Sequence, residues 1–186
     1  MGLYGGSFNP GHAGHRHVAL TALARLRLDA VWALVSPQNP LKPTAGMAPL
    51  AARLASARAA LAHPRIAVTD IETRLGTRFT ADTLAALRRR FPLVEFVWIM
   101  GADSLAGLHR WDRWRTIAAT VPIAVLPRPT YTLPAMVGVA ARRLARYKRL
   151  ARTAPALGCP GWTMLMTAQD ASSATRIREA RMPGRP

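Results

Sequence analysis

Short apolar runs alternate with longer amphipathic stretches along the chain. The first unit is an apolar run at residues 1–4, a Gly/Pro-rich loop at 5–14 and a helical pattern at 15–26. A short continuous apolar run is typical of a buried strand, and an amphipathic stretch is typical of a helix that covers it. The later apolar runs predict strands at 30–35, 66–69, 94–100, 123–126 and 162–166. The later amphipathic stretches predict helices at 48–62, 81–90, 135–152 and 174–180.

This alternation predicts an α/β protein. We expect a single-domain, three-layer, Rossmann-like parallel sheet with helices on both faces, because parallel strands need helical crossovers that pack on the sheet. The length of 186 residues fits one domain. No internal repeat or linker interrupts the pattern, so we expect the domain at residues 1–182 and a frayed tail at 183–186.

The composition excludes several classes of protein. Hydrophobic residues make up 50% of the chain, which is too many for a disordered protein. The longest apolar stretches, residues 96–102 and 117–126, are shorter than the ~20 residues that span a bilayer. Cys159 is the single cysteine, which excludes an internal disulfide. The amino terminus lacks the zones of a signal peptide, so we expect a cytoplasmic protein with no membrane partner.

The charge favours phosphate-bearing partners. Lys and Arg number 26 against 9 Asp and Glu, which gives a formal net charge of +17. The most basic segment, residues 142–152, contains no acid and lies in the predicted helix at 135–152. A solvated helix face opposite Val137, Ala140 and Leu144 explains this segment more simply than a nucleic-acid site does. We therefore expect small phosphate-bearing substrates rather than nucleic acid.

The Gly/Pro-rich loop at residues 5–14 is the most informative segment. A glycine-rich turn between a strand and a helix brings backbone N–H groups close to a ligand, and the helix N-terminus attracts an anion. The loop spells neither G-x-G-x-x-G nor G-K-[ST], the dinucleotide and Walker motifs. His12 and His15 are three residues apart at the helix entry, so both can donate to oxygens of one phosphate chain. Metal ligation would need further ligands that are not nearby in the sequence, and a packing role for one histidine is the other alternative.

The same loop resembles a known signature. Residues 6–15 read G-S-F-N-P-x-H-x-G-H and are similar to the signature of the nucleotidyltransferase superfamily of adenylyltransferases and cytidylyltransferases, in which Asp is commoner at the position of Asn9. The resemblance implies transfer of a nucleotidyl group from a nucleoside triphosphate to a phosphate-like acceptor, with pyrophosphate leaving. It implies that the ATP contacts in this loop come from Gly6, Ser7, Phe8, His12 and His15.

Three downstream segments resemble bacterial nicotinate-nucleotide adenylyltransferases. They are residues 32–42, 76–84 and 100–111, and with a C-terminal motif they extend the resemblance from Gly5 to Arg178. The resemblance implies nucleotide contacts from Gly101 and Asp103. It implies acceptor contacts from Gly6, Ser7, Lys42, Thr80, Thr83 and Trp111.

Each of these residues also has a simpler explanation. Lys42 on its loop can meet a phosphate or be a solvated lysine. Asp103 follows a strand and a glycine, where its carboxylate can accept hydrogen bonds from ribose hydroxyls or cap a helix. Trp111 can stack on a cationic pyridine ring or belong to the core. Thr80 and Thr83 can bond the acceptor nucleotide or cap the helix at 81–90.

Two further segments supply candidate phosphate ligands. Residues 173–178 resemble the superfamily's S-S-T-x-I-R motif, although Ala174 replaces its second serine. The motif implies that Ser173, Thr175 and Arg178 hold the triphosphate tail as charge develops on pyrophosphate. Arg128 follows the strand at 123–126 and is expected on the acceptor phosphate.

The resemblance implies transfer of AMP from ATP to nicotinate mononucleotide, which gives nicotinate adenine dinucleotide and pyrophosphate in NAD synthesis. The acceptor phosphate is already a nucleophile, so we expect in-line attack without a general base or a covalent intermediate. The resemblance implies His12, His15 and Arg178 as catalytic residues, with Mg²⁺ on the phosphates rather than in a protein metal site. Two alternatives stay open: another acceptor, nicotinamide mononucleotide or phosphopantetheine, and a basic nucleic-acid-binding protein.

Overall fold

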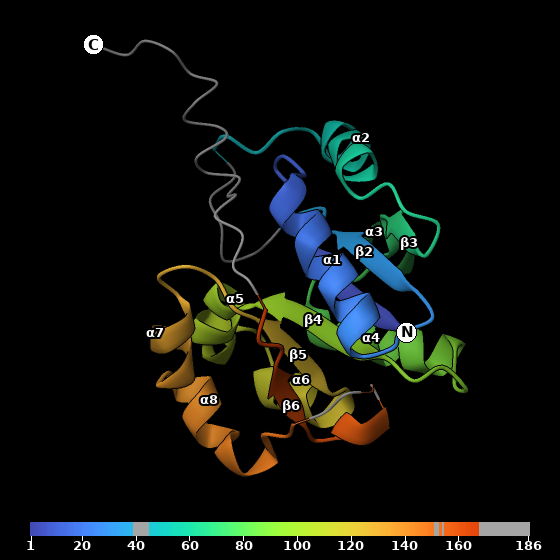
Figure 1. The fold of residues 1–186 in the computed structure, drawn as a ribbon. Helices are drawn as coiled ribbons and strands as arrows, with labels where there is room; N and C mark the ends of the chain where they lie inside the picture. Colours follow the sequence, from blue (N-terminus) through green and yellow to red (C-terminus); the bar gives the residue numbers. More distant parts are fainter. Residues whose placement is uncertain (39–44, 151–152, 154, 168–186) are drawn as a thin grey trace.

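Six strands form one parallel sheet in the computed structural model, which describes residues 1–38, 45–150, 153 and 155–167 (Figure 1). The order across the sheet is β3-β2-β1-β4-β5-β6, and all neighbouring pairs are parallel. The predicted fold class is therefore confirmed. The strands are β1 Gly2–Gly6, β2 Val31–Val35, β3 Ile66–Thr69, β4 Val97–Gly101, β5 Ile123–Leu126 and β6 Trp162–Met164.

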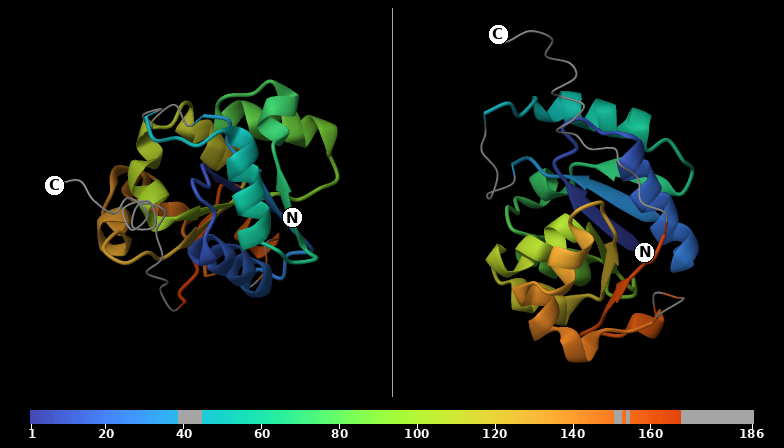
Figure 2. Two further views of the ribbon diagram at one scale, coloured as in Figure 1. Left: turned by 90° about the horizontal axis from the view of Figure 1, so that it is seen from above. Right: turned by 60° about the vertical axis from the view of Figure 1, so that its left-hand side comes forward.

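Helices connect the strands and cover both faces of the sheet (Figure 2). The α-helices are α1 Ala13–Arg25, α2 Leu50–Ala60, α3 Ile71–Leu75, α4 Thr80–Arg90, α5 Ala102–Gly107, α6 Trp114–Thr120, α7 Thr132–Met136 and α8 Val139–Arg143. The short 3-10 helices are η1 Leu108–Arg110, η2 Ala145–Tyr147 and η3 Pro155–Leu157. Within the part of the chain that the structure describes, none of these helices is long and apolar enough to span a membrane.

The strands divide the core into two halves. Side chains alternate between the two faces along a strand, so neighbouring residues enter different layers. Tyr4 packs in one buried cluster with Leu23 of α1 and Leu54 of α2. Leu3 packs in the other cluster with Leu84 of α4. The sheet is therefore buried on both faces, which explains why its strands read as continuous apolar runs.

The strand order reverses beside β1. On one side β1 pairs with β2, so that Gly6 lies opposite Val35, and on the other side it pairs with β4, so that Tyr4 lies opposite Ile99. In a parallel sheet, loops diverge at such a reversal and leave a crevice outside the carboxyl ends of the strands. The fold thus brings the loop after β1 and the turn after Gly101 to the same crevice.

The continuous basic helix predicted at 135–152 is wrong. The chain instead forms α7, α8 and η2, and Gly138 has an extended conformation, with φ −68° and ψ 164°, that separates α7 from α8. Glycine and Pro134 both disfavour a long helix through this region. Val137, assigned to the apolar face, is 68% exposed, whereas Ala140 is buried. The single basic helical face that would have favoured nucleic acid is therefore not formed.

Other differences concern boundaries and short helices. β1 continues to Gly6, α1 begins at Ala13 rather than 15, and β4 begins at Val97 rather than 94. α3, α5 and α6 were not predicted, because each is too short to show a helical period. The predicted helix at 174–180 and the predicted tail at 183–186 lie outside the described residues.

The carboxyl end of α4 offers a test of the core. Leu87 is fully buried, whereas Leu93 in the following loop is 96% exposed. We expect Leu87→Ala to lower the free energy of unfolding by about 2–5 kcal/mol, because it removes buried methyl groups and leaves a cavity. Leu93→Ala should change it by less than about 0.5 kcal/mol. Urea unfolding followed by circular dichroism measures both, and equal effects would contradict this assignment of the core.

Candidate active site

A cavity of about 450 Å³ lies at the reversal point of the sheet. Its lining includes the end of β1 at Gly5, Gly6 and Ser7, together with Asp103 after β4 and Trp111 after η1. A Cβ at position 5 would lie 2.6 Å from the Trp98 ring, so only glycine fits there. Residues predicted for the nucleotide and for the acceptor therefore meet at one cavity.

The loop after β1 is anchored by an aromatic side chain. Phe8 has φ 47°, a left-handed conformation that is costly for a non-glycine residue. Its ring is 1% exposed and packs on Tyr4 and His15, with ring centroids 5.5 and 4.7 Å away. The Phe8 side chain therefore supports the predicted ATP loop from the core.

Polar contacts also attach the loop to α2 and to the segment just before it. Asn9 donates from Nδ2 to the Gly46 carbonyl (2.9 Å) and accepts at Oδ1 from the Ala48 N–H (3.2 Å). Gly11 donates its N–H to Ser56 Oγ (3.1 Å). The Asn9 bonds use both an amide donor and an amide acceptor, which an aspartate could not supply. This explains how Asn9 serves at a position where aspartate is commoner.

His12 and His15 cap the first turn of α1 with their side chains. His12 Nδ1 accepts from the Gly14 N–H (3.1 Å), and His15 Nδ1 accepts from the His12 N–H (3.3 Å). Because Nδ1 is an acceptor in both rings, each neutral imidazole carries its proton on Nε2. The ring centroids are 3.9 Å apart. The fold thus joins two Nε2–H donors to the positive end of a 13-residue helix, a favourable place for phosphate.

Ser7 has a buried hydroxyl. Its residue exposure is 9%, and within the described part of the chain its Oγ has no hydrogen-bond partner. A buried polar atom without a partner is costly, so such atoms are usually satisfied by a ligand or water. Ser7 also lines the cavity. These observations support its predicted position beside a substrate.

Asp103 and Arg128 form a pair at the carboxyl ends of β4 and β5. Arg128 Nε lies 3.2 Å from Asp103 Oδ1. A Cβ at Gly101 would contact Asp103 Oδ1 and would lie 2.8 Å from Arg128 Nε, so the pair needs a glycine there. Asp103 does not cap α5 with its side chain, and it lines the cavity. The contact is an ion pair, and Arg128 Nε makes no hydrogen bond within the described residues. The contact of Arg128 with the acceptor phosphate stays a prediction.

Tyr4 lies beneath this pair. Burial raises the pKa of Tyr4 to about 12, and the Arg128 guanidinium opposes this rise. Tyr4 therefore stays neutral at physiological pH. Tyr4 interacts with the Asp103–Arg128 pair and also packs against Phe8, so it connects this pair with the loop after β1.

The predicted acceptor residues divide into two groups. Thr80 and Trp111 line the cavity, and the Trp111 ring packs edge to face on Trp98 with centroids 6.3 Å apart. Thr83 is fully buried and does not line the cavity. Its Oγ1 lies 2.9 Å from Thr77 Oγ1 and 3.4 Å from Glu72 Oε1. Neither Thr80 nor Thr83 caps α4 at its first turn.

The remaining predicted ligands lie outside the described residues. They are Lys42, Ser173, Thr175 and Arg178. Among the residues that the structure does describe, no three His, Cys, Asp or Glu side chains lie close enough together to hold a metal ion.

The comparisons with known proteins identify the family. Residues 3–180 match the Cytidylyltransferase-like family. The chain is 57% identical to the probable nicotinate-nucleotide adenylyltransferase of Cereibacter sphaeroides over 96% of each chain. It is 55% identical to that of Gluconobacter oxydans, over 97% of this chain and 94% of the relative. The chain belongs to the nicotinate-nucleotide adenylyltransferases.

Solved structures of Plasmodium falciparum nicotinic acid mononucleotide adenylyltransferase share the fold of this family member. The complex with NaAD has a TM-score of 0.69 at 15% identity, over 96% of this chain and 82% of that chain. The complex with APC has a TM-score of 0.67, also at 15% identity. The fold is therefore kept where most of the sequence differs.

Sequence reasoning missed Glu72, which lines the cavity of this adenylyltransferase. It is 6% exposed on the five-residue helix α3, which shows no period that could have marked it. Burial raises the pKa of Glu72, and hydrogen bonds from Ser36 and Thr83 oppose the rise. The only sequence signal is an acid soon after the apolar run that forms β3.

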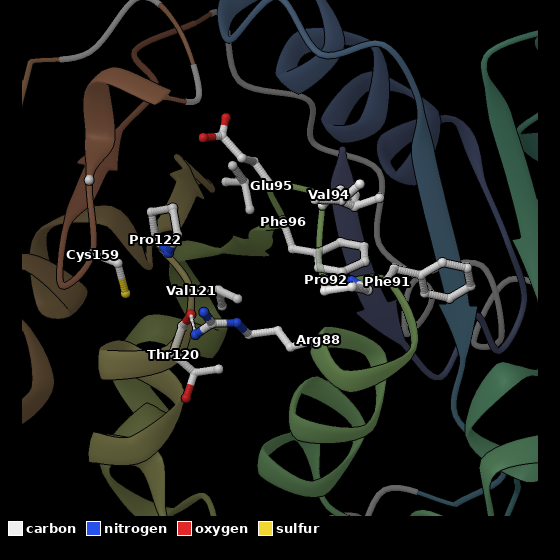
Figure 3. Close-up of a pocket in the computed structure, with 13 residues that line it drawn as sticks. Arg88, Phe91, Pro92, Val94, Glu95, Phe96, Thr120, Val121, Pro122 and Cys159 are labelled. Atoms are coloured by element: carbon white, nitrogen blue, oxygen red, sulfur yellow. Dashed lines mark hydrogen bonds between the residues drawn. The ribbon is translucent and has the colours of Figure 1, made fainter.

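A second cavity, of about 290 Å³, lies at the amino edge of β4 and β5 (Figure 3). Two of its polar side chains have protein partners. Arg88 donates to the Thr120 carbonyl (3.1 Å), and Cys159 Sγ donates to the Ala119 carbonyl (3.0 Å). Nothing in this cavity points to substrate chemistry, and it lies at the opposite end of the strands from Gly6 and Gly101.

Thr80, Trp111 and Glu72 line the same cavity, and we call the part that they form the acceptor wall. The raised pKa of Glu72 gives a test of this wall. A carboxyl whose folded pKa is raised contributes stability at acidic pH, which is lost as pH rises through that pKa. Glu72→Gln removes this loss, so its melting temperature should exceed that of the wild type at pH 8. The advantage should disappear as pH falls to 4. Calorimetry over this range measures it, with Glu95→Gln, an exposed carboxyl, as control. An advantage of Glu72→Gln that does not vary with pH would contradict the assignment.

Proposed function

We propose that this chain transfers the AMP group of ATP to nicotinate mononucleotide, giving nicotinate adenine dinucleotide and pyrophosphate. One observation carries the proposal. The segment Gly6–Ser7 lines the Trp111 cavity and leads directly into the loop that ends at the capping pair His12 and His15. Gly6 and Ser7 thus connect the cavity beside Trp111, which suits a pyridine nucleotide, with the histidine pair, which suits phosphates. The near full-length relatives at 55–57% identity support the same reaction.

The reaction needs positioning rather than proton transfer. An oxygen of the acceptor phosphate attacks the α-phosphorus of ATP, and a new P–O bond forms. The bond from the α-phosphorus to the oxygen that bridges it to the β-phosphorus breaks, and its electron pair leaves with pyrophosphate. The nucleophile is already an anion, so no general base is required. Catalysis then depends on donors placed where negative charge develops.

The proposed ATP contacts follow from the geometry of the loop. His12 and His15 donate from Nε2 to phosphate oxygens, with the N-terminus of α1 behind them. Ser7 supplies a hydroxyl, and Asp103 a carboxylate suited to ribose hydroxyls. From the sequence motif we propose that the leaving pyrophosphate is held by Ser173, Thr175 and Arg178.

The proposed acceptor contacts come from the opposite wall. Trp111 stacks on the cationic pyridine ring, and its edge contact with Trp98 fixes its orientation. Thr80 bonds the acceptor from the first turn of α4, and Thr83 acts behind it through Thr77 and Glu72. We propose Lys42 and Arg128 as ligands of the acceptor phosphate. This assignment of Arg128 requires its guanidinium to serve both Asp103 and the substrate.

Nucleotidyltransferases generally use a divalent cation. We propose that this cation is Mg²⁺ and that it arrives on the ATP phosphates as part of the substrate, where it neutralises negative charge. Asp103 is one of three carboxyl residues that line the cavity, and we propose that it bonds the water shell of this cation. A cytoplasmic location stays a prediction from the sequence.

The acceptor is tested by pyrophosphate release. Purified protein with ATP and Mg²⁺ receives nicotinate mononucleotide, nicotinamide mononucleotide or phosphopantetheine in separate reactions. We expect the highest kcat/KM with nicotinate mononucleotide, because Trp111 and Thr80 form a wall for a pyridine nucleotide. Preference for phosphopantetheine would move the protein to a sister activity. No release with any acceptor from folded protein would refute the proposed function.

The phosphate role of the imidazoles is tested by His15→Ala. We expect kcat to fall roughly 10²-fold or more, on the scale of losing one preorganised donor. His63→Ala is the control, because His63 lies in the loop between α2 and β3, where its Nδ1 accepts from the Arg65 N–H (3.1 Å). It should keep near-normal kcat. Comparable kcat in the two variants, both folded by circular dichroism, would remove His15 from the mechanism.

A further inference from the structure

Arg53 is a buried arginine that reaches from α2 to the loops beside the active-site cavity. It is 2% exposed. Its Nη1 donates to the carbonyls of Ser7 (2.9 Å) and Ser36 (2.7 Å). Its Nη2 donates to the Pro37 carbonyl (2.8 Å), and its Nε donates to the Ala48 carbonyl (2.9 Å). One guanidinium thus bonds four backbone carbonyls in three separate segments.

Among the described residues, no carboxylate forms an ion pair with Arg53. The ion pairs within the described residues belong to Arg74, Arg113 and Arg128. Burying a cation away from a counter-charge is costly, and burial accordingly lowers the pKa of Arg53. The cost is offset only by the four charge-assisted hydrogen bonds. A planar fork with five N–H groups can make these bonds together, whereas an ammonium group has three donors at one point.

The segments that Arg53 joins lie side by side at the cavity, where the Ser36 N–H donates to the Gly6 carbonyl (3.0 Å). Ser7 and Ser36 both line it, one after β1 and the other after β2. Ser7 and Arg53 are 46 positions apart in the sequence, and Ser36 and Arg53 are 17 apart. Ser7 also carries the buried hydroxyl that has no protein partner among the described residues. Holding its carbonyl fixes the backbone from which that hydroxyl projects.

We infer that Arg53 is a positioning residue for nucleotidyl transfer. It holds the Ser7 loop and the Ser36–Pro37 segment in one arrangement, so that the groups these two segments present to the cavity keep a fixed position. It acts through Ser7 and Ser36 rather than by touching a substrate. This inference rests on the proposed function, because its effect is read in the transfer of AMP.

The test is the steady-state kinetics of Arg53→Lys with ATP and nicotinate mononucleotide. Lysine keeps the charge and loses the fork, so the variant separates geometry from electrostatics. We expect kcat to fall roughly 10- to 100-fold, the scale of a misplacement of about 1 Å at a reacting centre. The KM of each substrate should change much less than kcat, because individual contacts with each substrate persist.

Two control variants separate positioning from lost stability. Leu87→Ala loses core packing at the amino end of the sheet, far from Ser7 along the strands. Arg88→Lys changes another arginine that donates to a backbone carbonyl, in this case at the second cavity (Figure 3). Both controls should keep near-normal kcat at a temperature where each is fully folded by circular dichroism. An Arg53→Lys kcat no lower than that of Leu87→Ala would overturn the inference.

A folding defect is handled by a second variant. If Arg53→Lys does not fold, Arg53→Met takes its place, because an uncharged chain of similar length removes the buried charge. The same loss of kcat is then expected. Failure of both variants to fold would assign Arg53 a purely structural role and overturn the inference. A wild-type protein without activity toward any acceptor would refute the proposed function, whereas an active wild type with an unaffected Arg53→Lys refutes this inference alone.

Discussion

The pairing of β1 with β2 on one side and β4 on the other is the constraint on which the site depends. It makes β1 the strand where the sheet order reverses, so loops from both halves of the sheet diverge around its carboxyl end. Gly5 allows Trp98 to pack directly against this strand, and Gly101 allows Arg128 to reach Asp103. Close approach of backbone and large side chains therefore shapes the cavity before any substrate binds.

The electrostatics of the site come from few groups in a strongly basic protein. The net charge of +17 favours anions generally, but it does not say where they bind. We propose that the imidazole pair at the start of α1 localises the phosphates. Arg53 lies behind the same loop, and the Asp103–Arg128 pair lies at the ends of β4 and β5. Glu72 adds a buried carboxyl with a raised pKa at the acceptor wall. Arg78 and Arg110 also line the cavity and add positive charge there.

The local motifs and the fold carry different information about this enzyme family. The chain shares 57% identity with a relative from Cereibacter sphaeroides and only 15% with the Plasmodium falciparum structures, which still have its fold. A parallel sheet with helices on both faces requires apolar runs of suitable length, which many sequences provide. The spacing of His12 and His15 in the glycine-rich loop is a narrower requirement, because both rings must cap the same helical turn.

The sequence by itself determined the strands, the long helices and the loop with its two histidines, because periodicity and short motifs act between near neighbours. It also indicated Trp111 and Asp103, which follow recognisable segments. Only the tertiary structure decided the break at Gly138, the burial of Thr83, and the roles of Glu72 and Arg53. Arg53 meets Ser7 across 46 positions, and Thr83 meets Glu72 across 11. Such contacts depend on how separate elements pack, so no local pattern contains them.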